Sequence, residues 1–211
     1  ADIRSIEILF DKGLLELAKR QISKSKKIAE AYEEFLPLYE LLKWELRIIN
    51  SQAFSAGSET ELGSLYKQAD DCLEKALNAN QYAFFSDTVY LRIRKFGFFR
   101  NESEFRKFSK LMKHPLLASE EKAASSEAKY YFHSSHIGFS ELHADYKSAY
   151  RHNKQILGYL ESHPSIIRKQ PRQYLTMLQN MLVWQYQLKQ FREALESVEK
   201  LKLFVLQQKN A

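Results

Sequence analysis

The chain has 211 residues, of which 45% are hydrophobic and 27% charged, and it carries a net charge of +6. This length and composition suffice for a buried core, so we expect a soluble globular protein. The single cysteine, Cys72, excludes an intramolecular disulfide and any multi-cysteine zinc or iron–sulfur site. No apolar run approaches the roughly 20 residues that a membrane-spanning helix requires, so we expect no membrane insertion.

The sequence predicts ten helices in five antiparallel pairs. Only six Gly and four Pro occur, which favours a mostly helical chain over a β-sandwich or a barrel. Turn and capping signals at Gly13, Pro37, Asn80, Asn101 and Gly138 separate the helices. The expected helices span residues 2–11, 14–34, 38–50, 60–79, 81–99, 102–113, 120–138, 142–162, 172–188 and 190–208.

One helical spacing recurs along the chain. Side chains at positions 0, 3, 7 and 10 share one face of a helix, and their repetition at intervals of tens of residues is typical of stacked helical hairpins. The clearest copies are Tyr66, Ala69, Leu73, Ala76 and Phe191, Ala194, Val198, Leu201; looser copies are Leu15, Ala18, Ile22, Ser25, then Tyr146, Ala149, Asn153, Ile156, and finally Phe105, Phe108, Met112. We therefore expect these residues to form the core faces of the hairpins.

The last helix pair resembles a tetratricopeptide repeat. Asn180 and Met181 match the Asn-Leu stretch of that family's first helix, and Phe191 and Ala194 match the aromatic-x-x-Ala opening of its second. The anchoring position recurs at 18, 69, 108, 149 and 194, at longer intervals than the family's 34 residues, which indicates elongated helices. HEAT-like and other α-hairpin stacks share this pattern and remain alternatives.

The resemblance implies an all-α superhelical stack of about five antiparallel hairpins, a TPR-like α-solenoid that binds a protein or peptide segment in its concave groove. It places six residues of the last unit on the groove side: Thr176, Gln179, Asn180, Val183, Tyr186 and Gln187. Alternatively, these residues pack against a following unit. We expect one α-helical repeat domain over residues 1–211, and the initial Ala in place of Met is typical of a processed protein or of a portion of a longer one.

The positive charge is concentrated in one predicted hairpin, between Val89 and Pro115. This segment has eight basic and two acidic residues, so its excess equals the net charge of the whole chain. The basic residues are Arg92, Arg94, Lys95, Arg100, Arg106, Lys107, Lys110 and Lys113, and they alternate with Tyr90, Phe96, Phe98 and Phe99. Cations mixed with rings are suited to an acidic peptide or to a single-stranded nucleic acid. The alternative is a solvated basic face whose rings turn into the core.

The histidines give only a weak indication of a metal site. His133 and His136 lie three residues apart on a predicted helix, and His143 or Asp145 is the candidate for a third ligand. The chain lacks HExxH, a glycine-rich phosphate loop, a G-x-S-x-G elbow and an activated cysteine. We therefore expect a non-catalytic protein-binding scaffold without a metal or a cofactor, with nucleic-acid binding at residues 89–115 as the alternative function.

Overall fold

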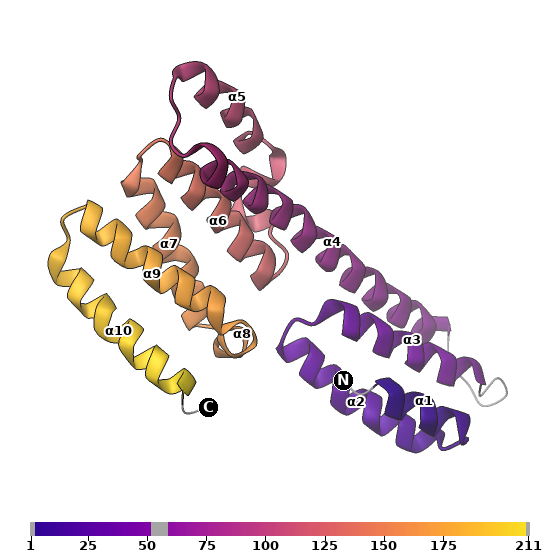
Figure 1. Ribbon diagram of the computed structural model, residues 1–211. Coiled ribbons are helices and arrows are strands. Elements are labelled where there is room, and N and C mark those ends of the chain that lie inside the picture. Colours follow the sequence, from indigo (N-terminus) through magenta and orange to yellow (C-terminus); the bar gives the residue numbers. More distant parts are fainter. Residues whose placement is uncertain (1–2, 52–58, 210–211) are drawn as a thin grey trace. The chain divides into compact units, whose positions relative to one another are not determined.

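The computed structural model describes residues 3–51 and 59–209, and these residues form helices and turns with no β-strand (Figure 1). The elements are α1 Ile3–Asp11, α2 Leu15–Ala31, α3 Phe35–Ser51, α4 Glu59–Phe96, α5 Glu102–Met112, the 3-10 helices η1 Pro115–Leu117 and η2 Glu120–Lys122, α6 Ser126–Leu142, α7 Tyr146–Glu161, α8 Pro164–Lys169, α9 Pro171–Gln187 and α10 Phe191–Lys209. The all-helical prediction is confirmed for these residues. The superhelical TPR-like arrangement stays a prediction.

The chain divides into two compact units, residues 1–78 and 79–211, here called unit 1 and unit 2. The expectation of one repeat domain stays a prediction. In unit 1, α1, α2 and α3 pack on one another around Ile6, Ile22, Leu41 and Ile48, which are at most 1% exposed. Unit 1 has a second cluster, between α3 and the first part of α4: Leu42, Leu46, Leu65, Ala69 and Cys72.

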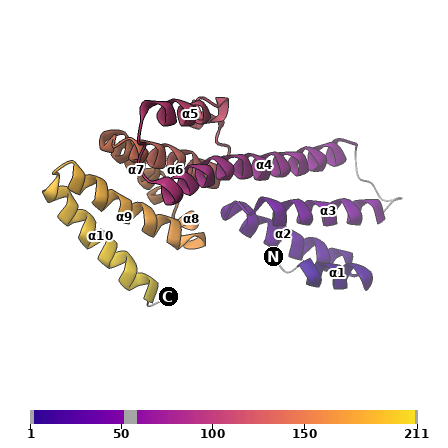
Figure 2. The ribbon, with the colours of Figure 1, turned by 45° about the horizontal axis from the view of Figure 1, so that its top comes forward.

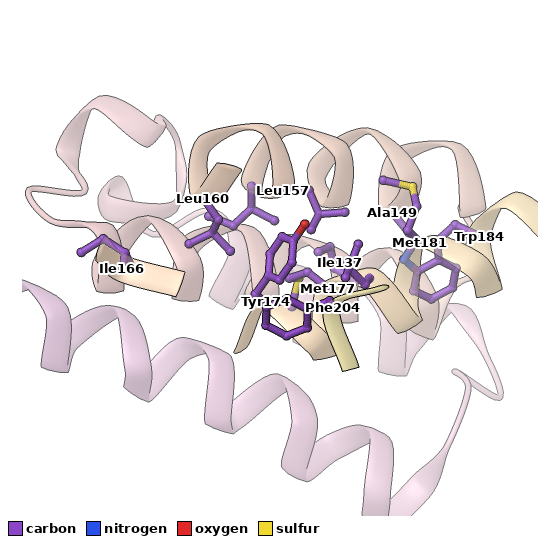
Figure 3. Close-up of a cluster of buried hydrophobic side chains, with 12 residues drawn as sticks. Ile137, Ala149, Leu157, Leu160, Ile166, Tyr174, Met177, Met181, Trp184 and Phe204 are labelled. Carbon is purple, nitrogen blue, oxygen red and sulfur yellow. The ribbon is translucent and has the colours of Figure 1, made fainter. Parts of the chain in front are cut away.

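Unit 2 contains the larger core. Its helices α6, α7, α9 and α10 pack on one another in chain order (Figure 2). Tyr174, Met177 and Trp184 of α9 lie in this core, and the ring of Tyr174 meets that of Phe204 of α10 edge to face at 4.8 Å (Figure 3). Full burial of such a side chain stabilises the fold by roughly 1.5–3 kcal/mol. Among the described residues, no helix is both long and apolar enough to cross a bilayer.

Four chain reversals use the same backbone motif. Gly13, Glu33, Ala144 and Lys189 have φ between 50° and 70°, and each follows the end of a helix. The amide of the residue after each one donates to the carbonyl oxygen five positions earlier, as Gln190 does to Gln185 at 2.8 Å. This is the hydrogen bond of a Schellman motif, which satisfies the free carbonyl groups at a helix end. The motif lets the next helix begin after a short turn.

Several predicted boundaries are wrong. The break at Asn80 does not exist, because α4 runs without interruption from Glu59 to Phe96 and contains no proline. The predicted helix 120–138 begins only at Ser126, after η2, and continues through Gly138 to Leu142. Residues 163–171, left between two predicted helices, contain the short helix α8.

The repeat spacing predicts the core faces only in part. Ala18, Ile22, Ala149 and Ile156 are all fully buried, as expected. However, Tyr66 and Leu73 of α4 are 57% and 41% exposed, and Phe191 and Val198 of α10 are 57% and 43% exposed, so their predicted core positions are wrong. The buried face of α4 follows Leu65, Ala69 and Cys72 instead, because the helix is rotated by about one residue relative to the predicted face.

Candidate functional site

The predicted basic hairpin is formed by the end of α4, the turn 97–101 and α5. Gly97, at φ 64°, ends α4, and Asn101 caps α5 by accepting a hydrogen bond from the Glu104 amide at 3.0 Å. The Phe99 amide donates to the carbonyl oxygen of Leu142 at 3.1 Å, which fixes the turn to the end of α6. The turn is therefore held by the side-chain cap of Asn101 and by one backbone bond from Phe99 to α6.

Arg92 stabilises this hairpin from within. Its guanidinium donates to the carbonyl oxygen of Gly97 at 3.2 Å and to the carboxylate of Glu104 at 2.8 Å. It also lies over the rings of Phe96 and Phe99, at 4.7 and 5.2 Å from the ring centroids. The side chain is only 13% exposed. Arg92 is thus a structural cation that links α4, the turn and α5.

The aromatic residues of the hairpin divide into two groups. Phe99, Phe105 and Phe108 are half-buried and pack on Phe139 of α6, at centroid distances of 5.8 to 6.3 Å. By contrast, Phe96 and Phe98 are 56% and 58% exposed. The first group fits the expected packing of rings into the core. The second group leaves two rings available for contact beside the basic side chains.

An open pocket of about 500 Å³ lies beside the turn. Its lining consists of Phe98, Phe99, Arg100, Asn101, Glu102, Phe105, Leu142, His143 and Ala144. The last three residues come from the end of α6 and the turn that follows it, and sequence analysis did not associate them with the hairpin. No local spacing could have done so, because about 40 residues separate the two segments.

The hairpin carries free positive charge. Five basic side chains are exposed and form no ion pair within the described part of the chain: Arg94, Lys95, Arg100, Lys110 and Lys113. Arg106 pairs with Glu102 at 3.1 Å, but both side chains are more than two-thirds exposed, so this pair contributes little to stability. We call these five cations, together with Phe96 and Phe98, the basic–aromatic surface.

The residues predicted to line the groove lie on one face of α9. Thr176, Gln179, Val183, Tyr186 and Gln187 are exposed, and Asn180 is half-buried. Tyr186 is 67% exposed, and its ring meets that of Phe191 edge to face at 6.1 Å. The opposite face of α9 carries the buried residues Tyr174, Met177 and Trp184. A role in partner binding stays a prediction for this α9 face.

The histidine pair has a different third member from the one expected. His152 of α7 joins His133 and His136, and its ring stacks on that of His136 at 4.5 Å and 7°. His143 instead packs on Phe105 and Phe139, and Asp145 caps α7 by accepting from the Ser148 amide. Within residues 3–51 and 59–209, no group of three or more His, Cys, Asp or Glu side chains is placed to hold a metal ion.

The contacts of these rings define their neutral tautomers. His136 Nε2 donates to the carbonyl oxygen of Leu117 at 3.0 Å, and His133 Nε2 lies 3.3 Å from the carboxylate of Glu120, which favours the proton on this nitrogen. His133 Nδ1 then accepts from His152 Nδ1–H at 3.1 Å. Burial lowers the pKa of His133 to about 4 and that of His152 to about 3, and the neighbouring histidines add to both shifts. The cluster is a neutral packing element that connects α6, α7 and the 115–122 segment.

Comparisons with models of known protein families, with curated proteins and with solved structures found no match.

Proposed function

We propose that this chain is a non-catalytic binding module that holds an acidic segment of a partner protein on the basic–aromatic surface. The observation that carries the proposal is the set of five exposed, unpaired cations beside two exposed rings on one hairpin. The hairpin that carries these cations is held rigid, so little further conformational entropy is lost when a partner binds. Unpaired cations also accelerate encounter with an acidic partner.

The rigidity of the hairpin supports this proposal. Arg92 connects the two helices through Gly97 and Glu104, so the surrounding cations project from a fixed backbone. The pocket lined by Phe98, Arg100 and Phe105 offers a place for an apolar or aromatic side chain of the acidic segment. The α9 face, with exposed Val183 and Tyr186, is the second surface that we propose for protein contact.

Single-stranded nucleic acid is the second candidate ligand, and the exposed Phe96 and Phe98 favour it. Bases stack on exposed rings, with about 1–3 kcal/mol per base, while neighbouring cations neutralise phosphates. If all five cations contacted phosphates, the logarithm of the affinity would fall with the logarithm of the salt concentration with a slope of about −3.5.

Fluorescence anisotropy with two probes tests the proposal. One probe is a labelled Glu/Tyr-rich peptide, and the other is a labelled oligothymidylate. We expect the peptide to bind and Arg94→Glu/Lys95→Glu/Arg100→Glu to weaken binding at least about ten-fold, which corresponds to 1.4 kcal/mol. Arg92 stays unchanged in this variant, because its reversal would disrupt the hairpin rather than test the surface.

The control reverses three exposed cations elsewhere in unit 2: Lys147, Lys154 and Arg172. It alters the net charge equally, so any effect of net charge alone would appear in both variants. Tight binding of the oligothymidylate with the expected salt dependence would make nucleic acid the ligand class. If neither probe binds, or if the two triple variants behave alike, the basic–aromatic surface is not the binding site.

A further inference from the structure

The outer face of α10 carries an apolar stripe. Its inner face packs on α9 through Leu201 and Phe204, and α10 lies at one edge of unit 2 in Figures 1 and 2. On the outer face, four aliphatic side chains are between 43% and 71% exposed: Leu195, Val198, Leu203 and Leu206. Their spacing along the helix places them on one broad side. Exposed aliphatic side chains gathered on one side of a helix form a candidate interaction surface.

Two opposite charges lie within this stripe. Glu199 and Lys202 are each about two-thirds exposed, and their charged atoms are 3.8 Å apart. The part of α10 before the middle of the stripe is acidic, with Glu193, Glu196 and Glu199 against Arg192, and the part after it begins with Lys200 and Lys202. The charge of the stripe therefore changes from negative to positive along the helix. Apolar residues lie before and after this change.

This pattern is complementary to itself in the antiparallel direction. A two-fold axis that crosses α10 between residues 200 and 201 brings Leu195 opposite Leu206, and Val198 opposite Leu203, of a second copy. The same axis brings Glu199 opposite Lys202. A parallel pairing would instead place Glu199 against Glu199 and Lys202 against Lys202, which is repulsive.

We propose that α10 pairs in antiparallel fashion with α10 of a second copy of this chain, through these six residues. Such an interface is isologous, because each contact occurs twice, and it forms a closed dimer. Each aliphatic side chain contributes on the order of 100 Å² when fully exposed, so two half-exposed stripes bury several hundred Å² of apolar surface. With the stems of Glu199 and Lys202, the interface stays below the roughly 1,000 Å² of a stable complex, so we expect a weak dimer that forms only at high protein concentration.

Sedimentation velocity over concentrations up to about 1 mM tests this dimer. Leu203→Glu places a charge in the proposed interface and should weaken the dimer at least about ten-fold. Leu36→Glu is the matched control, because Leu36 of α3 is also 58% exposed but lies in unit 1. It should leave the dimer unchanged. Both positions are exposed, so both variants should fold, and circular dichroism verifies this.

A charge exchange tests the register. Glu199→Lys and Lys202→Glu should each weaken the dimer, and the double variant should recover it, because the opposed pairs are restored with their signs reversed. A monomer at all concentrations would overturn the proposal, as would a dimer that is insensitive to Leu203→Glu or a double variant that stays monomeric. The assay contains no ligand, so its outcome is independent of the proposed function at the hairpin.

Discussion

Replacement of Gly138 by alanine should destabilise the protein, although alanine is the better helix former. Gly138 lies inside α6, where a Cβ atom would be 2.7 Å from Cγ1 of Val89 and 3.3 Å from Cδ1 of Ile93. Val89 is fully buried, and its β-branched side chain has little freedom to move aside. In a helix, glycine to alanine gains roughly 1 kcal/mol. Overpacking costs about 1–3 kcal/mol, so we expect a net loss of about 1 kcal/mol.

Gly158 provides the matched control. It lies in α7 of the same unit, and a Cβ atom there would meet nothing within 4 Å. Gly158→Ala should therefore stabilise the protein by about 0.5–1 kcal/mol. The same chemical change thus has opposite signs at two helical positions, with a difference of about 2 kcal/mol between the two variants. Urea denaturation followed by far-UV circular dichroism measures both free energies of unfolding.

A double-mutant cycle with Val89→Ala identifies the cause. Removal of the two Cγ atoms makes room for the new methyl group, so Gly138→Ala should be less harmful, or stabilising, in this background, with a coupling of about 1–3 kcal/mol. If Gly138→Ala stabilises the wild-type chain as much as Gly158→Ala does, then α4 and α6 do not approach as closely as described, and the reasoning is refuted.

Three further changes test other parts of unit 2. Folding keeps His133 neutral down to about pH 4 and His152 down to about pH 3, whereas both bind a proton near pH 6.5 in the unfolded chain, so the stability that they contribute is present above about pH 6.5 and is lost as the pH falls towards 4; urea titrations at several pH values should show this fall, and His133→Gln should reduce it. Arg92→Lys should lower the thermal midpoint, because an ammonium group cannot reach Gly97 and Glu104 in the same planar geometry; an unchanged midpoint would contradict the structural role of Arg92. Asn101→Ala should cost about 1 kcal/mol in urea denaturation through loss of the α5 cap, and Asn101→Asp should retain most of this stability.

The helices could be predicted from the sequence because their signals are local. The low content of Gly and Pro and the recurring spacing around Ala18 and Ala149 depend only on neighbouring residues, and both led to helices with buried faces. The reversals at Glu33, Ala144 and Lys189 could not be predicted in this way, because non-glycine residues adopt their positive φ there. At each of these three residues, the positive φ costs about 1 kcal/mol or more of conformational free energy. The packing of the helix that follows compensates this cost.

The candidate site depends on contacts between distant residues, which spacing does not encode. The excess of basic residues in 89–115 was visible in the sequence, but the difference between Arg92 and Arg94 was not. Only the ion pair with Glu104, twelve residues away, shows that Arg92 holds the hairpin while Arg94 remains exposed. Likewise, His152 lies beside His133 because α6 and α7 pack antiparallel. A search for ligands along one helix could not find this contact.

The burial of Cys72 provides a way to follow the opening of unit 1 alone. This side chain is 3% exposed between α3 and α4, and burial raises the pKa of its thiol, so both access and ionisation protect it from alkylating reagents. It is the only thiol in the chain, so the rate of its modification reports a single location. Modification faster than global unfolding would mean that unit 1 opens as a separate cooperative element, whereas equal rates would mean that the continuous helix α4 makes the two units unfold together.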